Sequence, residues 1–125
     1  MEAITAEAAP ASIGPYSTAI RDGDTLYLSG QGPIDPETGA VLEGDIREQT
    51  ALTLANIAAV LEAGGSSLDS VVKATVYLGD MDDYAAFNEA YAEHLTEPYP
   101  ARAAVEVGEF PVDVDVEIEV VATVE

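Results

Sequence analysis

The clearest alternation of hydrophobic and polar positions lies near the end of the chain. Valine or isoleucine occupies every second position from Val112 to Val120, and aspartate or glutamate occupies the positions between them. A period of two places the apolar side chains on one face of a β-strand and the carboxylates on the other. The pattern therefore predicts a strand over residues 112–120 that packs one face against a core.

Two segments show the helical period instead. The first begins at Asp45, which forms a pattern typical of a capping box with Glu48, and it ends at Gly64-Gly65. The second runs from about Met81 toward two prolines. The apolar stripes expected on these helices are Ile46, Leu54, Ile57 and Leu61 on the first, and Tyr84, Phe87, Tyr91 and Leu95 on the second.

Short strands account for most of the remaining chain. Residues 16–30 predict a hairpin that turns at Asp22-Gly23-Asp24, and the β-branched residues 70–78 predict a buried strand. We expect the first ~15 residues to form an arm and residues 30–39 to form turns. The order ββ-α-β-α-ββ predicts a single α+β domain over residues 1–125, with a mixed sheet and two helices on one face. Partner subunits are the simplest cover for the other face.

Charge narrows the possible functions. The chain has 24 aspartates and glutamates against four lysines and arginines, which gives a net charge of −20. A nucleic-acid surface needs a basic stripe that four cations cannot supply. We expect the cytoplasm of a salt-loving organism, where screening reduces self-repulsion; an ordinary acidic protein is the alternative. The chain has no cysteine, which excludes disulfides and thiolate metal sites, and its single histidine, His94, excludes a multi-histidine metal site within one chain. No apolar run reaches the ~20 residues of a membrane span.

Arg102 is the first candidate for chemistry. It lies in the stretch PARAAVEV, where the small side chains of Ala101, Ala103 and Ala104 leave room beside the guanidinium. Such a planar set of donors suits the capture of a small carboxylate through two hydrogen bonds. The alternative is a structural cation that pairs with one of the many carboxylates.

Other polar residues are harder to assign from their pattern. Glu117 lies on the charged face of the last strand, where Asp113, Asp115 and Glu119 fit a functional role equally well. Tyr16 and Ser29 flank the first hairpin and are typical surface or capping residues. Asn88 is more informative, because it is polar and adjoins the apolar stripe of the second helix.

Several separated stretches, taken together, resemble one known family. The stretches IGPYSTAI, LYLSGQGPIDPETG, NIAAVLEAGGSSLDSVVKATVYLGDMDDYAAFNEAY and PARAAVEV…VDVEIEVVA are similar to the reactive intermediate deaminase (RidA/YjgF) family, in order and from about residue 8 to the C-terminus. The resemblance implies a chorismate-mutase-like α+β domain that assembles as a homotrimer, with helices outside and active sites between subunits. It also implies an activity without a cofactor, the hydrolysis of 2-imino or enamine acids to 2-keto acids and ammonia.

The resemblance also implies roles for single residues. Arg102 matches the arginine that holds the substrate carboxylate, and Glu117 matches the glutamate that positions or activates water. The expected pocket lining consists of Tyr16, Ser29, Gly30, Asn88 and Ala104. The chain departs from the family at Ala103 and Ala104, where members often have serine followed by cysteine or threonine. The specific expectation is a 2-iminobutanoate/2-iminopropanoate deaminase; a non-catalytic carboxylate-binding or chaperone-like member is the alternative, and the negative charge argues against ribonuclease activity.

Overall fold

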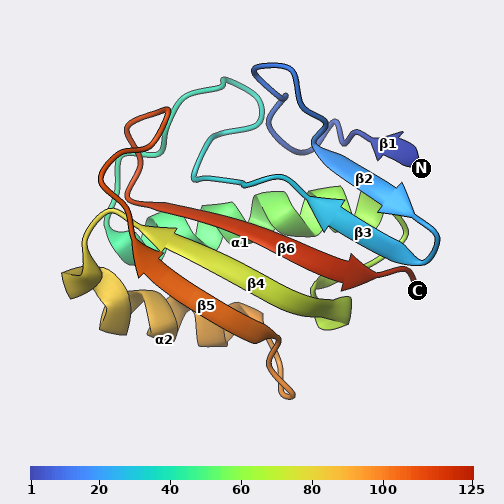
Figure 1. Ribbon diagram of the computed structural model, residues 1–125. Helices are drawn as coiled ribbons and strands as arrows, with labels where there is room; N and C mark the ends of the chain where they lie inside the picture. Colours follow the sequence, from blue (N-terminus) through green and yellow to red (C-terminus); the bar gives the residue numbers. More distant parts are fainter.

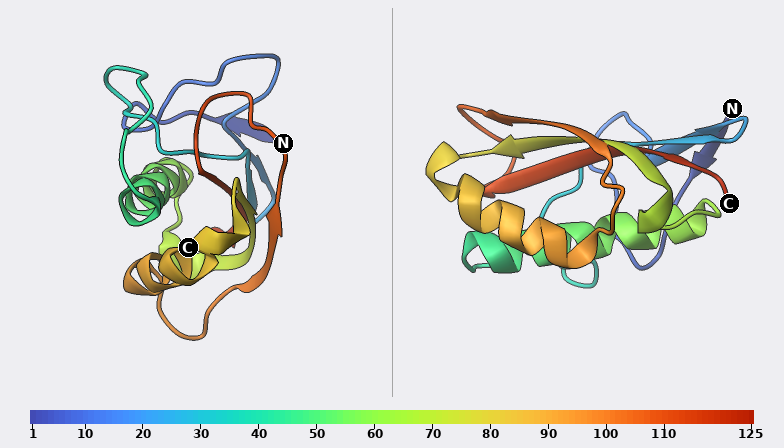
Figure 2. Two further views of the ribbon diagram at one scale, coloured as in Figure 1. Left: turned by 90° about the vertical axis from the view of Figure 1, so that its left-hand side faces the viewer. Right: turned by 90° about the horizontal axis from the view of Figure 1, so that it is seen from below.

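The computed structural model describes residues 1–125 as one six-stranded sheet with two helices packed on the same face (Figures 1 and 2). The strand order across the sheet is β1-β2-β3-β6-β4-β5. The elements are β1 (Glu2–Ile4), β2 (Ala19–Asp22), β3 (Thr25–Leu28), α1 (Ile46–Ala63), β4 (Val71–Leu78), α2 (Tyr84–His94), β5 (Ala101–Glu106) and β6 (Val116–Thr123). The α+β class, the mixed sheet and the placement of both helices are confirmed.

The sheet is mixed because of one crossover. Strands β2 and β3 form an antiparallel hairpin around Gly23, whose φ of +61° suits a residue without a side chain. Strand β6 pairs antiparallel with β3 on one side and with β4 on the other. Strand β5 pairs parallel with β4, and α2 is the crossover between them. Arg102 therefore lies on an edge strand beside the helix that precedes it.

Both helices have the local features expected of them. The Asp45 side chain accepts a hydrogen bond from the Glu48 amide at 2.9 Å, and the Asp45 amide donates to the Glu48 carboxylate, so the capping box is complete. Helix α1 ends at Ala63, directly before Gly64. The predicted second helix begins with a short 3-10 turn, Met81–Asp83, and becomes α-helical at Tyr84.

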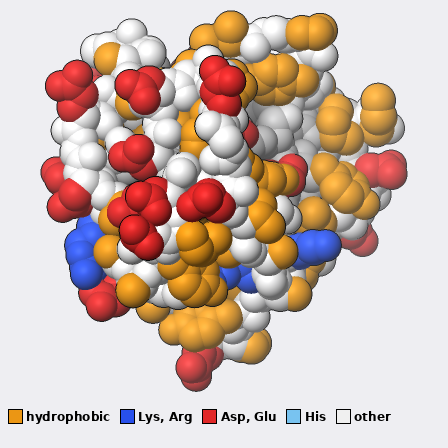
Figure 3. All heavy atoms as spheres, turned by 60° about the vertical axis from the view of Figure 1, so that its left-hand side comes forward, with side chains coloured by type: hydrophobic (Ala, Val, Ile, Leu, Met, Phe, Trp, Pro, Cys, Tyr) orange, Lys and Arg blue, Asp and Glu red, His pale blue; other side chains and the backbone are white.

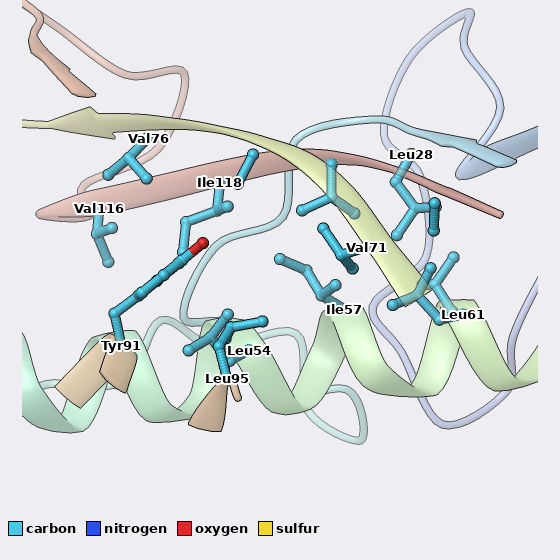
Figure 4. Packing of buried hydrophobic residues seen from close by; sticks show 14 of the residues in the cluster. Leu28, Leu54, Ile57, Leu61, Val71, Val76, Tyr91, Leu95, Val116 and Ile118 are labelled. Atoms are coloured by element: carbon cyan, nitrogen blue, oxygen red, sulfur yellow. The ribbon is translucent and has the colours of Figure 1, made fainter. Parts of the chain in front are cut away.

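The hydrophobic core lies between the helices and one face of the sheet (Figure 4). Leu54, Ile57 and Leu61 of α1 face the sheet together with Tyr91 of α2. The opposing sheet residues are the buried members of β4 and β6, which are Val71, Ala74, Val76, Leu78, Val116, Ile118, Val120 and Ala122. This core fixes α2 against the strands and therefore fixes the surroundings of Arg102.

The structure corrects the predicted boundaries in two places. Residues expected in an arm include β1, whose three residues pair with β2 at the sheet edge and are too few to show a period. The last strand begins at Val116 rather than Val112, although Val114 is still buried. The chain bends before Val116 because the Asp115 amide donates to the Gln49 side chain and the Asp115 carbonyl accepts from Gly79.

The second face of the sheet carries polar and aromatic side chains instead of a core. Tyr27 is 49% exposed, and Lys73 is exposed on the neighbouring part of the sheet. Tyr77 donates a hydrogen bond to Glu119 across β4 and β6. No helix of this chain covers that face (Figure 2), and a partner subunit over it remains a prediction.

Carboxylates far outnumber cations among the charged side chains, 24 against four. Asp and Glu side chains spread over much of the face in Figure 3, whereas Lys and Arg occupy small areas. The chain has one salt bridge, between the exposed side chains of Arg47 and Glu89. None of the helices is both long enough and apolar enough to cross a membrane.

This imbalance predicts stabilisation by salt. Raising KCl from about 0.1 M to about 1 M shortens the Debye length from about 10 Å to about 3 Å, which screens the repulsion between carboxylates. We expect the midpoint of thermal unfolding to rise over this range. Changing the exposed Glu43 and Glu62 to glutamine should reduce the dependence. A midpoint that stays constant or falls with KCl contradicts the prediction.

Candidate functional site

Arg102 lies on the helix-covered face of the sheet. It pairs with Ala74 of β4, which is buried in the core, so both side chains point toward the helices. The guanidinium lies beside three aromatic rings of α2, at 5.6 Å from the ring centres of Tyr84 and Phe87 and 4.9 Å from that of Tyr91. Cation–π attraction therefore holds the charge without neutralising it.

Two neutral side chains of α2 complete the surroundings of the guanidinium. Nη2 of Arg102 donates to Oδ1 of Asn88 at 2.8 Å and to the Tyr84 hydroxyl at 3.0 Å. No carboxylate lies within 4.0 Å of a guanidinium nitrogen of Arg102. The one salt bridge of the chain joins Arg47 to Glu89. Arg102 therefore forms no ion pair with a carboxylate of its own chain, in contrast to the structural alternative.

A cavity of about 260 Å³ adjoins Arg102 and Asn88. Its other lining residues are Tyr91, Ala92, Tyr99 and Pro100. Ala104, two residues further along β5, is half-buried and packs against the core on the same face as Arg102. Its small side chain adds no polar group to the arginine environment.

Glu117 lies on the opposite face of the sheet. It pairs with Tyr77 of β4, whose side chain belongs to the face that the helices leave open. Tyr27 of β3 pairs with Val121, and Gln31, beyond the end of β3, forms an isolated bridge with Ile118. Between these two pairs the β3 side has one residue more than β6, as in a β-bulge. Gly30 lies in the bulge, directly beside the Glu117 carboxylate.

A cleft of about 520 Å³ surrounds the Glu117 carboxylate. Predicted site residues that line it are Tyr16, Ser29, Gly30 and Glu117, and apolar side chains such as Ile13, Ile34 and Val114 form much of the rest. Burial raises the pKa of Glu117 above the ordinary value of 4.5, and the negative charge of Glu119 raises it further. The Glu117 side chain makes no hydrogen bond within the chain, so it can accept a proton from water.

Tyr16 and Ser29 hold the walls of this cleft. The Ser29 hydroxyl donates to the Ser17 carbonyl at 2.6 Å, which ties the end of β3 to the segment before β2. The Tyr16 hydroxyl accepts from the Ile13 amide at 3.3 Å, and its side chain is 52% exposed. Both residues shape the cleft, and the Tyr16 hydroxyl can still donate.

The predicted site residues thus form two separate groups within one chain. Arg102 and Asn88 lie on the helix face, at the β5 edge of the sheet. Tyr16, Ser29, Gly30 and Glu117 line a cleft associated with β6, and β4 lies between the two strands. Because Arg102 and Glu117 point from opposite faces, one chain does not bring them to the same substrate.

Two residues that adjoin Arg102 or Glu117 were not singled out from the sequence. Tyr84 was expected in the apolar stripe, yet its hydroxyl contacts Arg102 and its side chain is 38% exposed. Glu119 was an equal candidate to Glu117 by pattern, and Tyr77 binds it instead. The spacing of Tyr84 and Asn88 by one helical turn was the available sequence signal for the first contact.

Gly30 is required by its contact with Glu117. A β-carbon added at residue 30 would lie 2.0 Å from Oε1 of Glu117 and 2.9 Å from its carboxyl carbon. We therefore expect Gly30→Ala to displace the carboxylate and to slow any reaction in which Glu117 moves a proton by at least about tenfold, because a displacement of about 1 Å can cost a catalytic group that much or more. Gly108→Ala is the control, because no atom lies within 4 Å of that added β-carbon and the backbone at residue 108 does not have the positive φ that favours glycine. Equal rates for the two variants would contradict the prediction.

Comparison with known proteins identifies the family. The family described as endoribonuclease L-PSP matches residues 6–124. The chain belongs to this family, RidA/YjgF. A RidA crystal structure from the Antarctic bacterium Psychrobacter superimposes with a TM-score of 0.96 at 44% identity, and the match covers 99% of this chain and 100% of that one. The resemblance stated from the sequence is confirmed, as is its fold.

The names of RidA/YjgF relatives support a deaminase role in general terms. A RutC family protein of Pyrococcus horikoshii is 55% identical over 97% of this chain and 96% of its own length. The 2-iminobutanoate/2-iminopropanoate deaminase of Salmonella typhimurium is 43% identical over 95% of this chain and 94% of its own. The more similar relative has a family name only, so the substrate has to be argued from the site.

Proposed function

We propose that the chain is a deaminase that hydrolyses 2-imino and enamine acids, such as 2-iminopropanoate and 2-iminobutanoate, to 2-keto acids and ammonia. The observation that carries this proposal is the state of Arg102. In a chain with 24 carboxylates, its guanidinium is held by rings, a hydroxyl and an amide, and none of those carboxylates pairs with it. Such a charge is available for the carboxylate of a ligand.

Glu117 supplies the group that moves the proton. Water adds to the imine carbon, and the Glu117 carboxylate takes the proton that this water loses. Glu117 returns this proton to the imine nitrogen, which gives a neutral carbinolamine. It then carries the proton of the carbinol hydroxyl to the amine nitrogen, the C–N bond breaks, and ammonia leaves with the bonding electrons. The remaining carbinol oxygen becomes the keto oxygen. An imine is already electrophilic, so orientation of substrate and water supplies most of the acceleration.

The two groups of residues meet only if the active form contains more than one chain. Arg102 and Glu117 point from opposite faces of the sheet, and the face that bears Glu119 lacks a cover. We propose a homotrimer in which Arg102 and Asn88 of one copy complete the cleft around Glu117 of the next. A closed ring of identical contacts repeats this junction three times.

A direct assay tests the activity. A pyridoxal-phosphate dehydratase generates the imine, and the release of keto acid is followed with and without the protein, at a salt concentration that keeps it folded. We expect faster release with the protein. Release no faster than in buffer would reject the deaminase, and binding of the keto acid without turnover would support a carboxylate-binding member instead.

The family description also raises ribonuclease activity. A net charge of −20 repels phosphate, and the four lysines and arginines form no stripe that could neutralise it. We expect no RNA cleavage by the purified protein. Cleavage that Arg102→Ala removes would contradict this expectation.

A further inference from the structure

Tyr84 contacts Arg102 through both its ring and its hydroxyl. It is the first residue of α2, one helical turn before Asn88. Its ring centre lies 5.6 Å from the guanidinium carbon, and its hydroxyl accepts from Nη2 at 3.0 Å. Because the side chain is 38% exposed, the hydroxyl remains in reach of solvent.

The hydrogen bonds of Arg102 are distributed unevenly over the guanidinium. Arginine has five N–H donors. The two acceptors on α2, Tyr84 and Asn88, both bind Nη2. Nε and Nη1 make no hydrogen bond within the chain, so they remain for a ligand. Tyr84 and Asn88 thus determine which part of the guanidinium a carboxylate meets.

The protonation state of Tyr84 changes this arrangement. The Asn88 amide and then the Arg102 guanidinium lower the pKa of Tyr84 below its ordinary value of 10.0. Two charged side chains of β5 face the start of α2: Arg102 bonds the Tyr84 hydroxyl, and Glu106 accepts from the Met81 amide at 2.7 Å. On α2 itself Tyr91 contacts Arg102, and Asp82 and Asp83 precede Tyr84 without bonding its hydroxyl. Once ionised, Tyr84 becomes an anion beside Arg102 and competes with any carboxylate ligand.

We propose that Tyr84 is a positioning residue for Arg102 and that its hydroxyl sets the upper pH limit of carboxylate binding. As a phenol it orients the guanidinium and leaves the positive charge free. As a phenolate it neutralises that charge. The inference rests on the proposed function, because the substrate's carboxylate is the ligand of Arg102.

Binding of pyruvate, the keto acid formed from 2-iminopropanoate, tests this inference without the pH dependence of imine chemistry. Its carboxylate stays ionised from neutral to alkaline pH, and calorimetry measures its affinity. We expect wild-type affinity to fall by up to about tenfold per pH unit above the pKa of Tyr84. Tyr84→Phe should bind about two- to fivefold more weakly at neutral pH, because one orienting acceptor is lost, and should then show no such alkaline loss.

Tyr99→Phe is the matched control. Tyr99 lines the cavity beside Arg102 but forms no hydrogen bond with the guanidinium, so this variant should lose affinity in parallel with wild type. A titration of tyrosinate absorbance gives a second readout. The component at the lowest pH should vanish in Tyr84→Phe, because the pKa of Tyr84 is lowered, whereas a hydrogen bond to Glu119 raises the pKa of Tyr77 and burial raises that of Tyr91. The same component should move to higher pH in Arg102→Ala, because the guanidinium that helps to lower the pKa of Tyr84 is lost.

The outcomes separate this inference from the proposed function. Equal alkaline losses in wild type and Tyr84→Phe overturn the inference and leave the carboxylate site intact. No binding of pyruvate by wild type at neutral pH rejects the carboxylate site, and the inference is then wrong with it.

Discussion

Arg102→Ala should lower kcat/KM for imine hydrolysis by about 100-fold or more. The substrate carboxylate loses its charged partner, and truncating one member of a desolvated charge pair costs about 2–5 kcal/mol. Asn88 and Tyr84 also lose the donor that they share, so the geometry of the site changes with the charge. The measurement is keto-acid release from enzymatically generated imine.

Arg47→Ala provides the control for this loss. It removes the same charge from an exposed ion pair between Arg47 of α1 and Glu89 of α2, and such pairs contribute about 0–1 kcal/mol. Arg102→Lys should recover little, because an ammonium lacks the planar set of donors that the rings and the Asn88 amide enclose. Equal rates for Arg102→Ala and Arg47→Ala would show that Arg102 does not hold the substrate.

Glu117→Gln should lower kcat by about 100- to 10,000-fold while pyruvate still binds, because the amide fills the same space but cannot accept a proton. In the proposed mechanism, the wild-type enzyme requires the charged carboxylate, because only that form can accept a proton from water. Its rate should therefore fall as the pH decreases through the raised pKa of Glu117, above the ordinary value of 4.5. Glu109→Gln is the control, because it makes the same change at an exposed glutamate in a loop. A variant Glu117→Gln with wild-type kcat would exclude the assigned role.

The same substitution should raise stability at neutral pH. Burial raises the pKa of Glu117 in the folded chain above its unfolded value. The protonated carboxyl therefore favours the folded state at low pH, and this contribution is lost as the pH rises through the folded pKa. Glutamine is neutral at every pH, so the unfolding midpoint of Glu117→Gln should exceed that of wild type at neutral pH and approach it in acid.

The parts of the fold that depend on residues close together in the sequence could be predicted. The capping box at Asp45, the turn at Gly23 and the alternation through Val116 and Ile118 each depend on neighbours within one element. The strand β1 could not be predicted, because three residues show no period and their partner is a distant edge. The early bend at Asp115 depends on Gln49, which lies in another element.

The candidate site was predictable only in part. The scarcity of cations singled out Arg102, whereas choosing Glu117 over Glu119 required the family resemblance. The two glutamates differ through tertiary contacts, since Tyr77 binds Glu119 and Gly30 adjoins Glu117. The separation of Arg102 and Glu117 follows from the order β6-β4-β5 and from residue pairing, which local patterns do not contain.

A mixing experiment tests most directly whether Arg102 of one copy acts with Glu117 of another. Arg102→Ala and Glu117→Gln chains, each inactive alone, are unfolded together in equal amounts and refolded. If the site is shared, random assembly places an intact Arg102 beside an intact Glu117 in about a quarter of sites. We predict about that fraction of the rate of refolded wild type. No activity in a mixture that assembles as wild type does would contradict the shared site.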